Sequence, residues 1–232
     1  MKKTQAGMIK INQLSKQFGS LVAVNNIKLE INEPGLYIFV GANGSGKTTL
    51  FNLINGLILP SSGEIVFNNT AKGNKIEAFT GISTEPFKTE PYLTVEGIAE
   101  ISRFIKKVPK SEIEKWLSFW GLQQAKQKMF KNLSTGMKKR LSLALSLFGN
   151  PNLIFWDEPF NGLDPLGIEI LIQLISKLLH QEKYIFLSTH LLNEISTVEA
   201  TYFVMHEGKI IGTVHKNSKN KKTTILKLLK QI

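Results

Sequence analysis

The sequence contains no cysteine, which excludes disulfide bonds and thiolate metal sites. Long hydrophobic runs are also lacking: the longest, such as residues 141–148, are far shorter than a bilayer requires, so we expect no membrane-spanning segment. The basic residues at 1–5 are not followed by an apolar stretch, so we expect no signal peptide. These absences are compatible with a cytoplasmic location.

Acidic residues are scarce relative to basic ones. The chain of 232 residues has 18 Asp and Glu against 29 Lys and Arg, a formal charge of +11. Such an excess can favour nucleic acid, anionic lipid or an acidic partner. The basic residues form separate clusters at 106–107, 138–140 and 216–222, so we prefer a solvated basic surface and expect no specific nucleic-acid binding.

One stretch, residues 41–49, has the pattern of a phosphate-binding loop, Gly-x-x-x-x-Gly-Lys-Thr. It lies between the apolar run 36–40 and helix-forming residues, the context that this motif needs. Glycines let backbone N–H groups wrap a phosphate, and the helix N-terminus adds its dipole. A simple glycine-rich turn is the less favoured alternative. The residues expected to bind ATP here are Gly41, Asn43, Gly44, Ser45, Gly46, Lys47, Thr48 and Thr49.

Two side chains of this loop have expected roles of their own. Lys47 is placed to reach the β- and γ-phosphates, and the Thr48 hydroxyl to ligate Mg²⁺.

Strand and helix patterns alternate along the chain, which predicts an α/β fold with a parallel sheet and right-handed crossovers. Strands are predicted over residues 9–14, 22–31, 36–40, 63–67, 75–82, 153–156, 184–188, 201–205 and 209–214. Helices are predicted over residues 48–57, 94–107, 111–120, 134–148, 165–179, 191–198 and 225–232, with a turn at Asn68-Asn69. Thr94 is the expected N-cap of its helix, and Ser111 with Glu114 is expected to form a capping box.

We interpret residues 1–232 as a single domain with inserted parts. Residues 1–84 and 151–215 are predicted to form the α/β core with an N-terminal antiparallel β-subdomain. Residues 85–150 are predicted to form a helical subdomain, and 216–232 a basic connector with a short terminal helix.

A second motif places two carboxylates at the end of the apolar strand 153–156, where ligands of parallel sheets bind. Asp157 can hold Mg²⁺ through water opposite Thr48, while Glu158 can take a proton from an attacking water. A strand that merely ends in an acidic turn is the alternative, and the phosphate loop upstream makes it less favoured.

A third motif places Ser134, Thr135 and Gly136 where a helix is expected to begin. Such an N-terminus binds anions readily, although an ordinary serine N-cap is the alternative.

With these motifs the chain resembles, over nearly its whole length, the nucleotide-binding domain of ATP-binding cassette (ABC) proteins. Residues 41–48 correspond to the Walker A motif, 153–158 to Walker B and 133–137 to the signature motif. Residues 161–164 look like the D-loop, and 188–190 end in the switch histidine, His190. Phe18 stands where the family has an aromatic ring that stacks on adenine. The resemblance implies a P-loop NTPase (RecA-like) core with an antiparallel β-subdomain and an inserted α-helical subdomain.

The resemblance also implies a mechanism. Two cassettes pair head to tail around two Mg-ATP, so that each phosphate loop faces Ser134 and Gly136 of the other chain, and Asp164 couples the two sites. Glu158 polarises the attacking water, and His190 hydrogen-bonds the γ-phosphate.

Three features depart from the family pattern: the signature motif, the Q-loop position and the adenine-stacking position. Thr135 and Met137 replace glycine and glutamine in the signature, and Phe18 replaces the more frequent tyrosine, which preserves stacking. Glu85 stands at the position of the Q-loop glutamine; its carboxylate can ligate Mg²⁺ but cannot donate a hydrogen bond as an amide can. The signature and this glutamate resemble exporter-type ATPases, including those of bacitracin and lantibiotic self-protection systems, which favours export.

The sequence therefore predicts the ATPase subunit of an ABC transporter, with Mg²⁺ as cofactor. Its expected partners are a second ABC chain, identical or different, and a membrane permease that holds it at the inner face of the cell membrane. The basic helical region 98–139 is the expected docking surface for the permease. A soluble ABC ATPase acting on ribosomes or nucleic acid is the alternative. A degenerate cassette without turnover is disfavoured by the intact Thr48, Asp157, Glu158 and His190.

Overall fold

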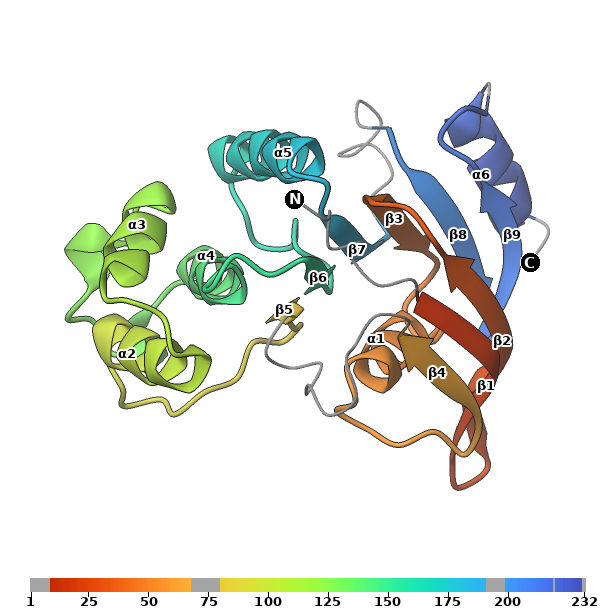
Figure 1. The fold of residues 1–232 in the computed structure, drawn as a ribbon, viewed down its shortest axis with the longest axis horizontal. Helices are drawn as coiled ribbons and strands as arrows, with labels where there is room; N and C mark the ends of the chain where they lie inside the picture. Colours follow the sequence, from red (N-terminus) through yellow and green to blue (C-terminus); the bar gives the residue numbers. More distant parts are fainter. Residues whose placement is uncertain (1–8, 68–79, 191–198, 219, 231–232) are drawn as a thin grey trace, which may run out of the picture.

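The chain is built around a six-stranded sheet (Figure 1). The computed structural model describes residues 9–67, 80–190, 199–218 and 220–230. The strand order is β5-β6-β7-β3-β8-β9, and all neighbours are parallel except the hairpin pair β8 and β9. The strands are β3 (Gly35–Val40), β5 (Thr80–Ser83), β6 (Leu153–Trp156), β7 (Tyr184–Thr189), β8 (Thr201–His206) and β9 (Lys209–Val214).

A separate antiparallel sheet has the order β2-β1-β4. Its strands are β1 (Ile9–Phe18), β2 (Leu21–Ile31) and β4 (Ser62–Phe67). This sheet and helix α1 (Lys47–Ile54) cover one face of the central sheet, where Phe39 and Phe155 are buried.

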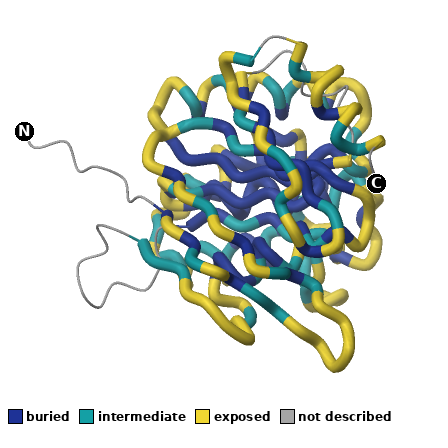
Figure 2. The backbone as a smooth tube through the Cα atoms, turned by 90° about the vertical axis from the view of Figure 1, so that its right-hand side faces the viewer, coloured by how far each residue is buried: buried dark blue, intermediate teal, exposed yellow. Residues whose placement is uncertain are grey.

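The residues adjacent to these two in the same strands point to the other face of the sheet, because side chains alternate along a strand. Ile38 and Trp156 pack there with helix α5 (Pro165–His180) and with the helical region. Both faces of the parallel strands are therefore covered, as is usual for parallel sheets. Figure 2 shows buried segments at the centre of the molecule and exposed residues mainly in the segments around them.

Between β5 and β6 the chain forms helices α2 (Val95–Lys106), α3 (Ser111–Phe119) and α4 (Thr135–Ser146), with 3₁₀ turns at Gln123–Ala125 and Phe130–Asn132. Figure 1 shows these helices beside the β5 edge of the sheet, with α4 nearest to it. Thr94 caps α2 as predicted, since its hydroxyl accepts a hydrogen bond from the Gly97 N–H. No helix of the described ranges is both long and apolar enough to span a bilayer.

The predicted capping box of α3 is wrong. The residue before the helix is Lys110, which already has helical backbone angles and provides no side-chain cap. A turn in which the Glu112 N–H binds the Pro109 carbonyl leads into the helix, so Ser111 lies inside it and not at its cap.

Several helix boundaries differ from the predictions, with the largest differences at α1 and at the terminal helix. Helix α1 ends at Ile54, before Gly56 with its φ of +70°. The terminal helix α6 spans Lys221–Lys230 and so includes lysines that we assigned to the connector; burial of Ile225 attaches it to the core. The predicted turn at Asn68-Asn69, the start of the strand predicted over 75–82 and the helix predicted over 191–198 lie outside the described residues.

Candidate nucleotide site

A cavity of about 730 Å³ lies at the carboxyl ends of β3 and β6, where ligands of parallel sheets bind. Its lining combines the start of β2, the glycine-rich loop, the end of β6 and the turn between β8 and β9. The lining residues are Leu21, Val22, Ala23, Asn25, Asn43, Gly44, Gly46, Lys47, Thr48, Thr49, Glu85, Asp157, Glu158, Asn161 and Glu207. A cavity of about 790 Å³ at the opposite, amino-terminal ends of β3 and β8 contains none of the predicted site residues.

Lys47 is buried, and its ammonium donates hydrogen bonds to the carbonyls of Gly41 at 2.8 Å and Ala42 at 3.0 Å. Burial lowers the pKa of Lys47, whereas the nearby carboxylates of Glu158 and Asp157 act to raise it. The loop therefore holds the lysine folded back on its own backbone, within the cavity.

The positions of the loop require glycine for different structural reasons. A Cβ on Gly41 would lie 2.3 Å from the Met205 carbonyl oxygen, and one on Gly46 would lie 2.3 Å from that of Ala23. Gly46 also has a φ of +100°. Around Gly44, by contrast, no described atom would lie within 4 Å of a Cβ. Gly41 and Gly46 thus permit close backbone packing, whereas Gly44 faces open space but has a φ of +83°, which favours glycine.

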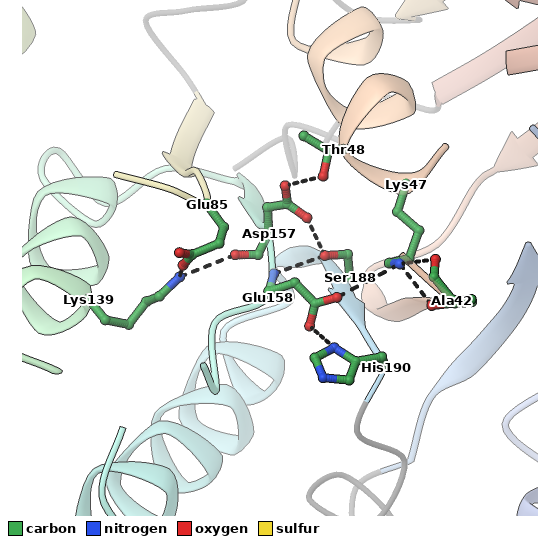
Figure 3. A network of polar contacts seen from close by, with 10 residues as sticks. Ala42, Lys47, Thr48, Glu85, Lys139, Asp157, Glu158, Ser188 and His190 are labelled. Carbon is green, nitrogen blue, oxygen red and sulfur yellow. Dashed lines mark hydrogen bonds and ion pairs between the residues drawn. The ribbon is translucent and has the colours of Figure 1, made fainter. Parts of the chain in front are cut away.

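Asp157 is held by hydroxyl groups on both sides (Figure 3). The Thr48 hydroxyl donates to Asp157 Oδ2 at 2.6 Å, and the Ser188 hydroxyl donates to Asp157 Oδ1. The Ser188 oxygen in turn accepts a hydrogen bond of 2.9 Å from the Glu158 N–H. Helix α1, β6 and β7 are joined at this point.

Glu158 lines the cavity, and its side chain is largely buried. Its Oε2 lies 3.0 Å from Nδ1 of His190, and its Oε1 lies 3.8 Å from the ammonium of Lys47. Within the described chain, Glu158 Oε1 is buried and has no hydrogen-bond partner. A buried acceptor without a partner is costly, which is expected where a reactant completes the hydrogen bonding.

The residues expected to ligate Mg²⁺ provide oxygen atoms, which are the donors that this ion prefers. Thr48, Asp157 and Glu85 all line the cavity. The described residues contain no group of three or more His, Cys, Asp and Glu side chains that could hold a metal. Mg²⁺ usually takes only one or two carboxylates and completes its shell with water and substrate phosphate, so the donor set fits a nucleotide-bound ion.

Comparison with known proteins decides the family. The family model described as "ABC transporter" matches residues 24–161, which is more than half of the chain. The chain belongs to the ABC transporter family. A model described as "AAA domain, putative AbiEii toxin, Type IV TA system" matches a shorter part of the cassette, residues 129–196.

Curated relatives of the cassette are transport proteins. The bacitracin transport ATP-binding protein BcrA of Enterococcus faecalis is 34% identical over 213 residues, covering 90% of this chain and 69% of that protein. The lantibiotic transport ATP-binding protein SrtF of Streptococcus pyogenes is 32% identical over 205 residues, covering 88% and 89%.

A solved dimeric ATP-binding cassette, in a post-hydrolysis state bound to ADP and Pi, matches with a TM-score of 0.80 at 23% identity and covers 91% of this chain and all of that one. The predicted fold class is therefore confirmed.

The signature residues of the cassette do not line this cavity. Ser134 caps α4, accepting a hydrogen bond of 3.2 Å from the Met137 N–H, and Asp164 caps α5 through the Gly167 N–H at 3.1 Å. A hydrogen bond from Arg140 holds the pKa of Asp164 below its usual value. A Cβ on Gly136 would lie 2.7 Å from the Gly162 carbonyl oxygen, so the signature and the D-loop pack together.

Phe18, the expected adenine-stacking residue, is 48% exposed at the end of β1 and is not itself a lining residue. It pairs with Leu21, which does line the cavity. The ammonium of Lys16 lies 5.0 Å from the centre of the Phe18 ring.

Sequence reasoning missed two residues of the network, Ser188 and Lys139 (Figure 3). Ser188 is a small polar residue in an apolar strand, and that is the signal that could have marked it. Lys139 lies in one of three basic runs, so no local pattern distinguished it. Asn161 and Glu207 were also not predicted to line the cavity.

Proposed function

We propose that this cassette binds and hydrolyses Mg-ATP and thereby drives export through a separate membrane permease, which holds it at the inner face of the cell membrane. The observation that carries the proposal is Glu158, a cavity-lining residue: its buried Oε1 has no hydrogen-bond partner among the described residues and lies 3.8 Å from the ammonium of the phosphate-loop lysine, Lys47. Relatives named for bacitracin and lantibiotic transport favour export of a peptide antibiotic.

The residues would divide the chemistry as follows. Lys47 exchanges the carbonyls of Gly41 and Ala42 for phosphate oxygens when nucleotide binds. Bound Mg²⁺ would neutralise part of the phosphate charge, and Thr48, Asp157 and Glu85 are the protein donors that would hold it.

Glu158 Oε1 accepts a hydrogen bond from the attacking water, while His190 holds Oε2 and so fixes the orientation of the carboxylate. In the complete site, His190 also contacts the γ-phosphate.

A second cassette chain would complete the site. Ser134 and Thr135 are exposed at the N-terminus of α4, and together with Gly136 and Asp164 they lie outside their own chain's cavity. The N–H groups at that helix end suit an anion, which a facing phosphate loop would supply. The partner chain is a second copy or a related cassette.

The permease would dock on helix α2. Ile101, Phe104 and Ile105 recur on one face of that helix and are exposed, Phe104 by 78%, and Tyr92 precedes the helix with its ring exposed. A cavity of about 130 Å³ next to them is lined mostly by apolar residues, among them Phe87 and Leu93. Exposed apolar side chains gathered in this way are typical of a protein interface.

The test is steady-state ATP hydrolysis by wild type and Glu158→Gln. We expect the variant to lose about 10²–10⁴-fold in kcat, the usual contribution of a general base, while still binding nucleotide. Equal rates would remove Glu158 from its role. Purification from membranes tests the partner: recovery with a polytopic protein supports the proposal, and recovery alone, with salt-dependent binding to RNA or DNA, contradicts it.

A further inference from the structure

Lys139 on α4 is a buried charge that the mechanism above does not use. It is 3% exposed, and lysine is rarely buried so completely without a partner. Its ammonium forms an ion pair with Glu85 Oε2 and lies 3.4 Å from the backbone carbonyl oxygen of Asp157 (Figure 3). Both partners belong to residues that line the nucleotide cavity.

A second contact ties the same helix to the same place. The hydroxyls of Ser142 and Ser83 lie 2.8 Å apart, and the Ser83 carbonyl accepts the Asp157 N–H at 2.8 Å. Ser142 follows Lys139 by three residues and therefore lies on the same face of α4. Thus α4, which is capped by the signature serine, is attached to the ends of β5 and β6 by neutral hydrogen bonds and by one ion pair.

Glu85 is shared between this ion pair and the cavity. It is held by a cation on one side, and it is also a lining residue with a partly exposed side chain. A cation within ion-pair distance lowers the negative potential that a carboxylate offers to a metal ion. Lys139 and a nucleotide-bound Mg²⁺ would therefore compete for the same carboxylate.

We propose that Lys139 is a positioning residue that limits how strongly Glu85 engages the divalent cation, and that the two side chains form one charge-balanced unit joining α4 to the nucleotide site. The proposal deepens the function proposed above. Replacing one member leaves the other charge uncompensated, whereas replacing both with amides leaves the region neutral.

The test measures Mn²⁺ binding to the ADP-loaded cassette by electron paramagnetic resonance of free Mn²⁺. We expect Lys139→Gln to tighten Mn²⁺ binding about 3–10-fold, because Glu85 is released to the metal. In a Glu85→Gln background, the same substitution should change the affinity less than about twofold, because the carboxylate through which it acts is gone. Equal tightening in both backgrounds, or none in either, would overturn the proposal.

Two controls separate this effect from general charge and folding effects. Lys138→Gln removes the same charge from the neighbouring position, where the ammonium lies 5.0 Å from the centre of the Phe130 ring, and should leave Mn²⁺ affinity unchanged. Lys139→Arg keeps the charge and should bind Mn²⁺ within about twofold of wild type.

Thermal unfolding of the nucleotide-free protein gives a measurement that does not involve metal. Glu85→Gln leaves a buried ammonium without its counter-charge, so its unfolding midpoint should lie below that of the double variant Glu85→Gln/Lys139→Gln. A double variant that is less stable, with additive effects, contradicts a paired unit. These binding and unfolding measurements do not depend on turnover, so their outcome is distinct from that of Glu158→Gln.

Discussion

Replacing Ser188 with alanine tests whether the acidic end of β6 depends on β7. Ser188 is completely buried, and its hydroxyl is the link between the two acidic residues. It donates to Asp157 Oδ1 and accepts the N–H of Glu158, whose backbone has the unusual φ of +46°. The substitution removes one oxygen atom and leaves both partners buried.

The cost follows from those two contacts. A hydrogen bond to a charged acceptor contributes about 1.5–3 kcal/mol, and a buried N–H left without a partner costs about 1–3 kcal/mol. Since the cavity lets water reach part of the carboxylate, we expect a loss of about 2–4 kcal/mol in the free energy of unfolding. Release of the Glu158 backbone should also misplace its carboxylate and lower kcat at least about tenfold.

The assay is urea unfolding of nucleotide-free protein together with steady-state ATP hydrolysis. Ser176→Ala is the control, because the Ser176 hydroxyl donates a hydrogen bond of 3.2 Å to the Ile172 carbonyl of its own helix, α5. This substitution should change the free energy of unfolding by less than about 0.5 kcal/mol. If Ser188→Ala were as stable and as active as Ser176→Ala, the reasoning about this link would be refuted.

Two further predictions concern the loop and the helical region. Gly46→Ala should destabilise the protein by about 2–4 kcal/mol and abolish nucleotide binding, because Gly46 has a positive φ and a Cβ there would clash with the Ala23 carbonyl. The control is Gly35→Ala, whose Cβ would meet only ordinary contacts at 3.7 Å. Thermal unfolding and nucleotide titration compare the two variants, and equal behaviour would contradict the prediction. Burial lowers the pKa of Lys106 from 10.5 to about 8, so between these values the unfolded chain binds more protons and stability rises with pH. The unfolding free energy of wild type relative to Lys106→Met should therefore rise by roughly 1–3 kcal/mol from pH 8 to 10.5, and a flat difference would contradict this.

The sequence was sufficient for the parts of the site that are continuous in the chain. The phosphate loop and the acidic strand end are short segments whose local pattern determines their backbone, and the structure brings Thr48 to Asp157 as expected. The prediction of a capping box at α3 was wrong. Ser111 and Glu114 have the spacing of a capping box, but the turn that begins at Pro109 places Ser111 inside the helix.

Contacts between distant segments could not be predicted in that way. The ion pair between Lys139 and Glu85 and the hydrogen bond between Ser188 and Asp157 join side chains more than thirty residues apart. The pattern of apolar residues along the sequence does not predict which lysine or serine will face a given carboxylate, because the order of strands in the sheet determines these contacts. Such contacts become visible only when β5, β6 and β7 are placed side by side.

The phosphate loop is held in place mainly by backbone atoms. The Gly208 N–H donates to the Ser45 carbonyl at 3.1 Å, and the Gly208 carbonyl accepts the Asn25 N–H at 2.8 Å. The turn between β8 and β9 therefore bridges the loop to β2, the strand that lines the other side of the cavity. The two walls of the cavity are thus connected through backbone hydrogen bonds, so side chains along them can change in evolution without removing the connection.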